Sequence, residues 1–70
     1  MMPLNLAQRG SPQIIKRIGG NLEVKKHLED LGFCVGEQVT VINDFDGNLI
    51  IKVKDSRIAL NSELARKIMI

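Results

Sequence analysis

The fold is decided by two β-rich runs and the short connection between them, Val39-Thr40-Val41-Ile42-Asn43-Asp44-Phe45-Asp46-Gly47-Asn48-Leu49-Ile50-Ile51-Lys52-Val53. Asp46-Gly47 is typical of a tight hairpin turn, because both positions of such a turn favour residues that accept a positive φ. Apolar residues alternate along both runs and so share one face of each strand: Val39, Val41, Leu49, Ile51 and Val53. The stretch predicts a central β-hairpin with one buried face.

Downstream of this hairpin, Lys54-Asp55-Ser56 reads as a turn into a short strand over residues 57–60. Asn61 or Ser62 is a good N-cap for a single helical turn over residues 63–65. The chain then closes with a predicted last strand over residues 66–70.

Upstream, an amphipathic helix is predicted over residues 21–31. Asn21 is a favourable N-cap, and Val24, Leu28 and Leu31 have the i, i+4, i+7 spacing of one helical face. Gly32 suits the left-handed position that ends a helix, and the apolar residue after it is placed to pack back over the last turn.

The N-terminal third contains two further strand predictions. Apolar residues alternate over positions 2, 4 and 6, which predicts a short edge strand because Pro3 cannot donate a hydrogen bond to an inner ladder. The β-branched run over residues 13–18 predicts a second strand, with Ile14, Lys16 and Ile18 on one face. Gly19-Gly20 ends it.

Seventy residues, of which 44% are hydrophobic and 26% charged, make one folded domain spanning residues 1–70. Five or six short strands and one helix leave many sheet edges for so small a domain, and closure of the sheet is the usual way to remove them. The expected fold is therefore mainly β, a small, partly open β-barrel with one amphipathic helix across one end.

Composition argues against several classes of function. Ten Lys and Arg against eight Asp and Glu give a net charge of +2, and the chain has two Phe but no Tyr or Trp, so stacking surfaces for nucleic acid are not expected. Cys34 is the single cysteine and the chain opens with no secretory leader pattern, which favours the reducing cytoplasm. No stretch has the length and hydropathy of a membrane span, so direct membrane insertion is not expected.

The sequence offers no catalytic arrangement, because its one His and one Cys lack an orienting third group, and no enzyme activity is predicted. For a transition metal such as Fe²⁺, the candidate ligands are His27, Asp30 and Cys34 around the end of the helix. Their spacing matches no four-ligand motif, and ordinary solvated side chains beside a core cysteine are the alternative. No cofactor is required by this reading.

Four basic residues, Lys16, Arg17, Lys25 and Lys26, flank the Gly-Gly turn and the start of the helix. They indicate a patch complementary to an acidic partner surface, with an ordinary solvated face as the alternative. The sheet edges are a second candidate contact, since unpaired backbone groups accept an added strand unless nearby proline and charges protect them.

An ordered series of motifs runs through the chain: residues 4–7, then Leu28-Glu29-Asp30-Leu31-Gly32-Phe33-Cys34-Val35-Gly36-Glu37-Gln38-Val39-Thr40-Val41, residues 47–53, residues 57–60 and residues 65–70. In this series the chain resembles the FeoA family of the ferrous iron transport system over nearly its whole length. Family members often carry Arg at the position of His27 and Pro at the position of Val35. No role of that Arg is carried over to this chain.

The resemblance implies an SH3-like barrel in the bacterial cytoplasm that binds FeoB, a membrane transporter with a cytosolic GTP-binding domain, and modulates it without catalysis. The predicted contact is the helix over residues 21–31, through Lys25, Lys26 and His27 as exposed side chains. Two alternatives stay open. One is a direct Fe²⁺ sensor or carrier, and the other is a regulatory domain like the C-terminal domain of metal-dependent repressors.

Overall fold

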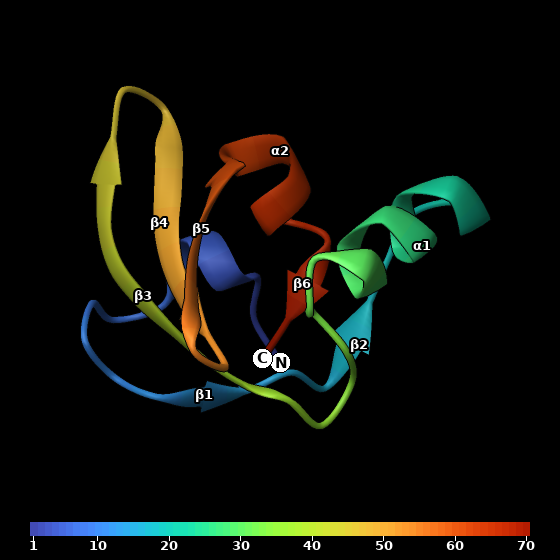
Figure 1. Ribbon diagram of the computed structural model, residues 1–70, viewed down its shortest axis with the longest axis horizontal. Helices are drawn as coiled ribbons and strands as arrows, with labels where there is room; N and C mark the ends of the chain where they lie inside the picture. The colour runs from blue at the N-terminus through green and yellow to red at the C-terminus, as the bar shows by residue number, and fades with distance from the viewer.

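The computed structural model describes residues 1–70 and contains two β-sheets (Figure 1). One sheet has four strands in the order β1-β3-β4-β5, and the other pairs β2 with β6. The elements in chain order are η1 (Leu4–Leu6), β1 (Gln13–Ile14), β2 (Arg17–Ile18), α1 (Leu22–Asp30), β3 (Gln38–Phe45), β4 (Asn48–Val53), β5 (Ser56–Asn61), α2 (Ser62–Ala65) and β6 (Ile68–Met69). The prediction of a mainly β chain of five or six short strands with one amphipathic helix is confirmed, and the structure has six strands.

The central hairpin forms as its sequence predicts. β3 and β4 pair antiparallel around Asp46 and Gly47, whose φ values of 52° and 79° are those of a type I′ turn. A bulge between Val41 and Asn43 shifts the register of β3 against β4. The five alternating apolar residues of the hairpin all have exposed fractions of 4% or less, so the predicted face is the buried one.

Helix α1 begins and ends where the sequence places its caps. Asn21 Oδ1 accepts a hydrogen bond from the Val24 N–H at 2.9 Å. At the other end Gly32 has φ +105°, and the N–H groups of Gly32 and Phe33 donate to the carbonyls of Glu29 and Leu28, the two bonds of a Schellman motif. Phe33 is fully buried as a result.

The predicted first strand is wrong. Leu4–Leu6 forms the 3₁₀ turn η1, in which the N–H groups of Leu6 and Ala7 donate to the carbonyls of Pro3 and Leu4. Only the residues before η1 pair with a strand, since Met2 and Ile70 exchange backbone hydrogen bonds of 2.9 and 2.8 Å. The alternation at positions 2, 4 and 6 therefore does not reflect a sheet face: Leu4 is buried whereas Leu6 is exposed.

The predicted strand over residues 13–18 divides into β1 and β2. The Ile15 N–H donates to the Glu37 carbonyl, whereas the next N–H, that of Lys16, donates to the Met69 carbonyl. The segment thus leaves the larger sheet and joins the smaller one between these two residues. Ile15 is buried and Lys16 exposed, but Arg17 is exposed as well, so the expected alternation breaks at the crossing.

Fourteen buried apolar residues form one core between the two sheets and the helices, and no polar residue is buried in it. Asn61 caps α2 through its Oδ1, which accepts a hydrogen bond from the Leu64 N–H at 2.8 Å. The chain termini meet where Met2 pairs with Ile70, and residues 13–18 connect the two sheets (Figure 1). The arrangement is the partly open barrel that the strand count predicts.

Candidate interaction surfaces

Helix α1 presents its predicted contact residues on different sides. Lys26 and His27 are exposed, as predicted, but Lys25 is half-buried, which corrects the expectation of a fully exposed side chain. Lys25 lies on the flank of the helix, close to the side that Val24 and Leu28 turn toward the core. The three residues therefore do not form one flat basic face.

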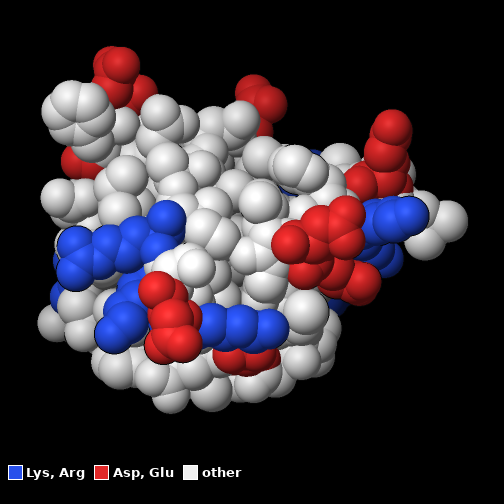
Figure 2. Space-filling view, in the orientation of Figure 1, with Lys and Arg blue, Asp and Glu red and all other residues white.

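Helix α1 carries charges of both signs. Each of the three contact candidates has an acidic residue four positions away on the same helical row: Glu23 with His27, Lys25 with Glu29, and Lys26 with Asp30. Acidic side chains accordingly dominate the part of α1 visible in Figure 2. The surface of α1 is mixed in charge, whereas the sequence led us to expect a basic patch.

The first turn of α1 also carries a large apolar side chain that the spacing of the buried face does not include. Leu22 has an exposed fraction of 84%, the highest among the exposed large apolar residues. It lies four positions before Lys26 on the same row. The sequence contains a signal for the exposure of Leu22, because this residue lies outside the i, i+4, i+7 series that begins at Val24.

The other two basic residues predicted for this patch, Lys16 and Arg17, are exposed and lie on or beside β2. Arg17 pairs with Met69 across the smaller sheet, and the Gly19 N–H donates to the Lys67 carbonyl at 2.7 Å. Lys67 thus belongs to the same region, which pairing with β6 brings about. A reading of the sequence by neighbouring positions alone does not show this.

The proposed metal ligands are not brought together. No group of three His, Cys, Asp or Glu side chains is placed to hold a metal ion, so His27, Asp30 and Cys34 do not form a joint site. His27 and Asp30 lie on the exposed side of α1, whereas Cys34 is a half-buried free thiol beyond its end. The donor set of this chain does not fit a three-ligand metal site.

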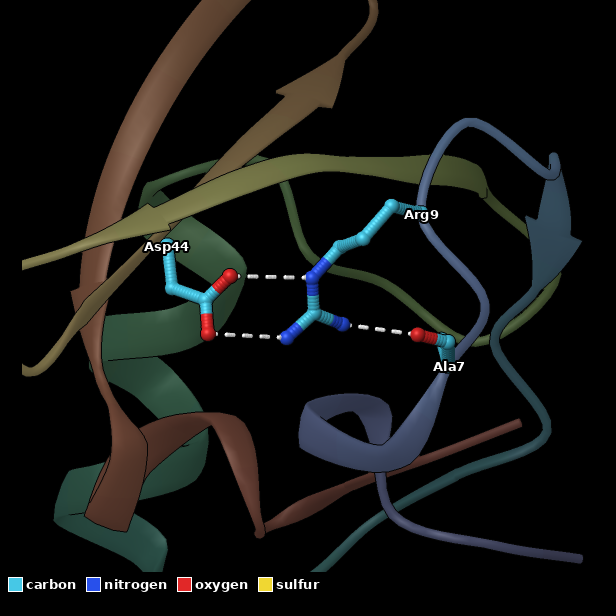
Figure 3. Close-up of polar contacts among 3 residues, drawn as sticks. All are labelled: Ala7, Arg9 and Asp44. Carbon is cyan, nitrogen blue, oxygen red and sulfur yellow. Dashed lines mark hydrogen bonds and ion pairs between the residues drawn. The ribbon is translucent and has the colours of Figure 1, made fainter.

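One ion pair is present, and it lies away from α1 (Figure 3). Arg9 Nε donates to Asp44 Oδ1 and Arg9 Nη2 contacts Asp44 Oδ2, both at 3.1 Å, while Arg9 Nη1 donates to the Ala7 carbonyl at 2.7 Å. The hydrogen bond and positive charge of Arg9 lower the pKa of Asp44 below its ordinary value of 3.8. The pair holds the N-terminal loop against β3, which is a structural role.

The larger sheet carries a basic row on the face that points away from the core. Lys52 pairs directly with Arg57 on β5, and Thr40 on β3 pairs with Lys52 from the other side. Lys52, Lys54 and Arg57 are exposed and form no ion pair. Figure 2 shows Lys and Arg side chains gathered over the lower part of the sheet.

A shallow polar hollow of about 480 Å³ adjoins this row and is lined by Pro12, Glu37, Gln38, Thr40, Lys52 and Lys54. The lining contains no arrangement of nucleophile and base. Sequence reasoning missed the basic row, although the hairpin register, once known, places Lys52 opposite Arg57. No helix of the chain has the length and hydropathy of a membrane span.

Comparison with known proteins assigns the fold and the family. The FeoA domain model matches residues 2–70. A Methanocaldococcus jannaschii protein, named as an Fe(2+) transport protein A, is 36% identical to this chain over 70 residues. The match covers 100% of this chain and 85% of that protein.

Solved structures agree with this assignment. The crystal structure of an iron uptake regulatory protein, FeoA, superposes with a TM-score of 0.86 at 27% identity, covering 96% of this chain and 89% of that one. Stenotrophomonas maltophilia FeoA complexed with zinc, described as a prokaryotic SH3 domain protein, has a TM-score of 0.84 at 21% identity, covering 99% and 88%. The chain has this SH3-like fold and, by the match over residues 2–70, belongs to the FeoA family of ferrous iron transport proteins.

Proposed function

We propose that this protein is a non-enzymatic accessory protein of ferrous iron uptake that docks in the cytoplasm on the GTP-binding part of a FeoB-type transporter and modulates it. The observation that carries the proposal is the FeoA match over residues 2–70. The absence of a nucleophile and base arrangement from the sequence supports a binding role over a catalytic one.

The exposed side of α1 is the proposed docking surface. Leu22, Lys26 and His27 are exposed on it, and none of their side chains forms a hydrogen bond or ion pair within the chain. An exposed leucine beside charged side chains is the composition of a small protein contact, in which an apolar anchor is surrounded by a polar rim. Lys25 contributes from the flank of the helix.

The test is an NMR titration of the ¹⁵N-labelled protein with the cytosolic part of its FeoB-type transporter, with and without a GTP analogue. The largest changes in amide chemical shift should lie on α1. The double variant Lys25→Glu, Lys26→Glu should bind about tenfold more weakly and with less dependence on salt.

The matched control is the double variant Lys52→Glu, Arg57→Glu, which changes the net charge by the same amount on the basic row of the larger sheet. It should bind the transporter domain as the wild type does. Equal weakening by both double variants would show that the effect follows net charge and would overturn α1 as the docking surface. Shifts around His27 and Cys34 on anaerobic addition of Fe²⁺ alone would instead support the metal sensor or carrier.

A further inference from the structure

The free edge of β5, meaning the side of Ser56–Asn61 that faces away from β4, has no partner in the fold. β5 is the last strand in the sheet order and pairs with β4 only. The two strands are joined by the two residues Lys54 and Asp55, and Val53 pairs with Ser56. In such a hairpin the flanking residues are hydrogen-bonded to each other and bonded positions then alternate along the strand.

This alternation determines which backbone groups are free. Ser56, Ile58 and Leu60 direct their N–H and carbonyl groups toward β4, so those of Arg57 and Ala59 point away from the sheet. No backbone hydrogen bond outside the helices and strands involves Arg57 or Ala59, and both residues are exposed. Two consecutive outward-facing positions are thus ready to pair with another strand.

β5 lacks most of the features that protect natural sheet edges. Such edges are commonly very short, bulged, or interrupted by proline. β5 has six residues, pairs with β4 without a register shift, and contains no proline. Its one charged residue is Arg57, so the edge discriminates between partner strands by charge.

The charge that Arg57 presents is reinforced by its neighbour. Lys52 lies directly opposite Arg57 in a position that is not hydrogen-bonded, where side chains approach most closely, and like charges so placed are unfavourable. Residues 48–61 carry Lys52, Lys54 and Arg57 but only one acidic residue, Asp55 in the turn. An acidic side chain on a strand next to β5 would lie beside Arg57 and offset this repulsion.

We propose that the free edge of β5 binds an extended acidic segment of a partner protein as an added strand. Acidic side chains of this segment lie beside Arg57 on the outer face of the sheet. The alternate side chains point to the inner side, where Ile58 is half-buried, so the segment alternates acidic and apolar residues. A second copy of β5 does not fit this description, because Ser56–Asn61 contains no acidic residue. This surface is independent of α1 and of the proposed function.

The probe for the test is a blocked hexapeptide, Val-Glu-Val-Glu-Val-Glu, titrated into the ¹⁵N-labelled full chain, with Val-Lys-Val-Lys-Val-Lys as the charge control. The acidic peptide should shift the amides of Arg57 and Ala59, and occupancy of about 90% should slow their hydrogen exchange about tenfold. The Arg57→Glu variant should weaken binding about tenfold. The basic peptide should leave the spectrum unchanged.

Two further variants separate strand addition from charge attraction alone. Ala59→Pro removes an outward-facing N–H without removing a hydrogen bond to β4, so it should weaken binding of the acidic peptide. The double variant Lys25→Glu, Lys26→Glu changes charge on α1 and should leave binding of this peptide unchanged. The amide spectrum of each variant shows whether it is folded, and Arg57→Glu serves if Ala59→Pro is not. Shifts confined to α1, equal binding of both peptides, unchanged binding by Arg57→Glu, or concentration-dependent self-association through β5 would each overturn the proposal.

Discussion

β1 and β5 form the two edges of the four-stranded sheet, and only the β1 side is continued by other parts of the chain. β1 has only two residues, but the loop before it continues the contact with β3. The Gly10 N–H donates to the Val41 carbonyl at 2.8 Å, and Arg9 forms an ion pair with Asp44. β5 has six residues and no strand on the side that faces away from β4. One edge of the sheet is thus closed by contacts from the N-terminal loop, while the other keeps backbone hydrogen-bonding groups without a partner.

The largest effect should come from deleting the side chain that packs where the β1 edge turns into the smaller sheet. Ile15 has an exposed fraction of 1%, so Ile15→Ala should lower the free energy of unfolding by about 2–5 kcal/mol. The matched change on β5 is Ile58→Ala. Because the Ile58 side chain is only half-buried, this change should lower the free energy of unfolding by about half as much. Urea unfolding measures both, and equal costs would show that the two edges contribute alike to the core.

Backbone strain should also separate the two edges. Gly10, in the loop that covers β3, has φ +82° and open space where a Cβ would lie, so Gly10→Ala should cost about 1–2 kcal/mol through its conformation alone. Lys54, in the β4–β5 turn, has φ +55°, so Lys54→Gly relieves a similar cost but adds the chain entropy of glycine.

The expected free energy of unfolding of Lys54→Gly is therefore within about 0.5 kcal/mol of the wild-type value. Thermal unfolding of both variants checks this. A loss of stability for Lys54→Gly as large as that for Gly10→Ala would contradict the assigned conformations.

A smaller effect is expected from the like-charged pair on the β5 side. Lys52→Glu should raise the free energy of unfolding by about 0.5 kcal/mol, because it replaces a repulsion with Arg57 by an attraction. Lys52→Gln, which removes only the repulsion, should gain less. The difference should shrink in 1 M salt, and a gain that does not depend on salt would point to a cause other than charge.

The smallest effect is the pH dependence of the ion pair on the β1 side. Arg9 lowers the pKa of Asp44 in the folded protein below its unfolded value, so the pair contributes stability above about pH 4 that is lost as the pH falls through the folded pKa. Between pH 5 and pH 2, Asp44→Asn should therefore lose less stability than the wild type. Urea unfolding at these two pH values measures the free energy of unfolding of each protein. An equal loss for Asp44→Asn and the wild type would show that the ion pair does not contribute to stability.

Much of the fold could be predicted because its signals are local. The Asp46-Gly47 turn, the Asn21 cap and the Gly32 ending of α1 each depend on the conformations of a few adjacent residues. The division of residues 13–18 could not be predicted, because it depends on two distant acceptors, the carbonyls of Glu37 and Met69. Periodicity shows which residues are apolar but not where a strand changes partner.

The candidate surfaces divide in the same way. Exposure of Lys26 and His27 follows from helical periodicity, whereas the acidic residues Glu23, Glu29 and Asp30 give the surface of α1 a mixed charge that the basic residues alone do not predict. The row of Lys52 and Arg57 could not be identified before the β4–β5 register was known. The metal hypothesis shows the same limit, since spacing alone cannot tell whether His27, Asp30 and Cys34 meet in space.

The order of amino acids was enough to predict the hairpin, the limits of α1, the buried face of the central strands and the family. These depend on local backbone preference and on the alternation of apolar residues, which a linear reading contains. Tertiary structure alone decided that residues 4–6 form η1, that residues 13–18 cross between sheets, that Arg9 meets Asp44, and that β5 keeps a free edge. The physical reason is that each of these depends on which distant backbone or charged group is within hydrogen-bonding reach, and only the packed core sets those distances.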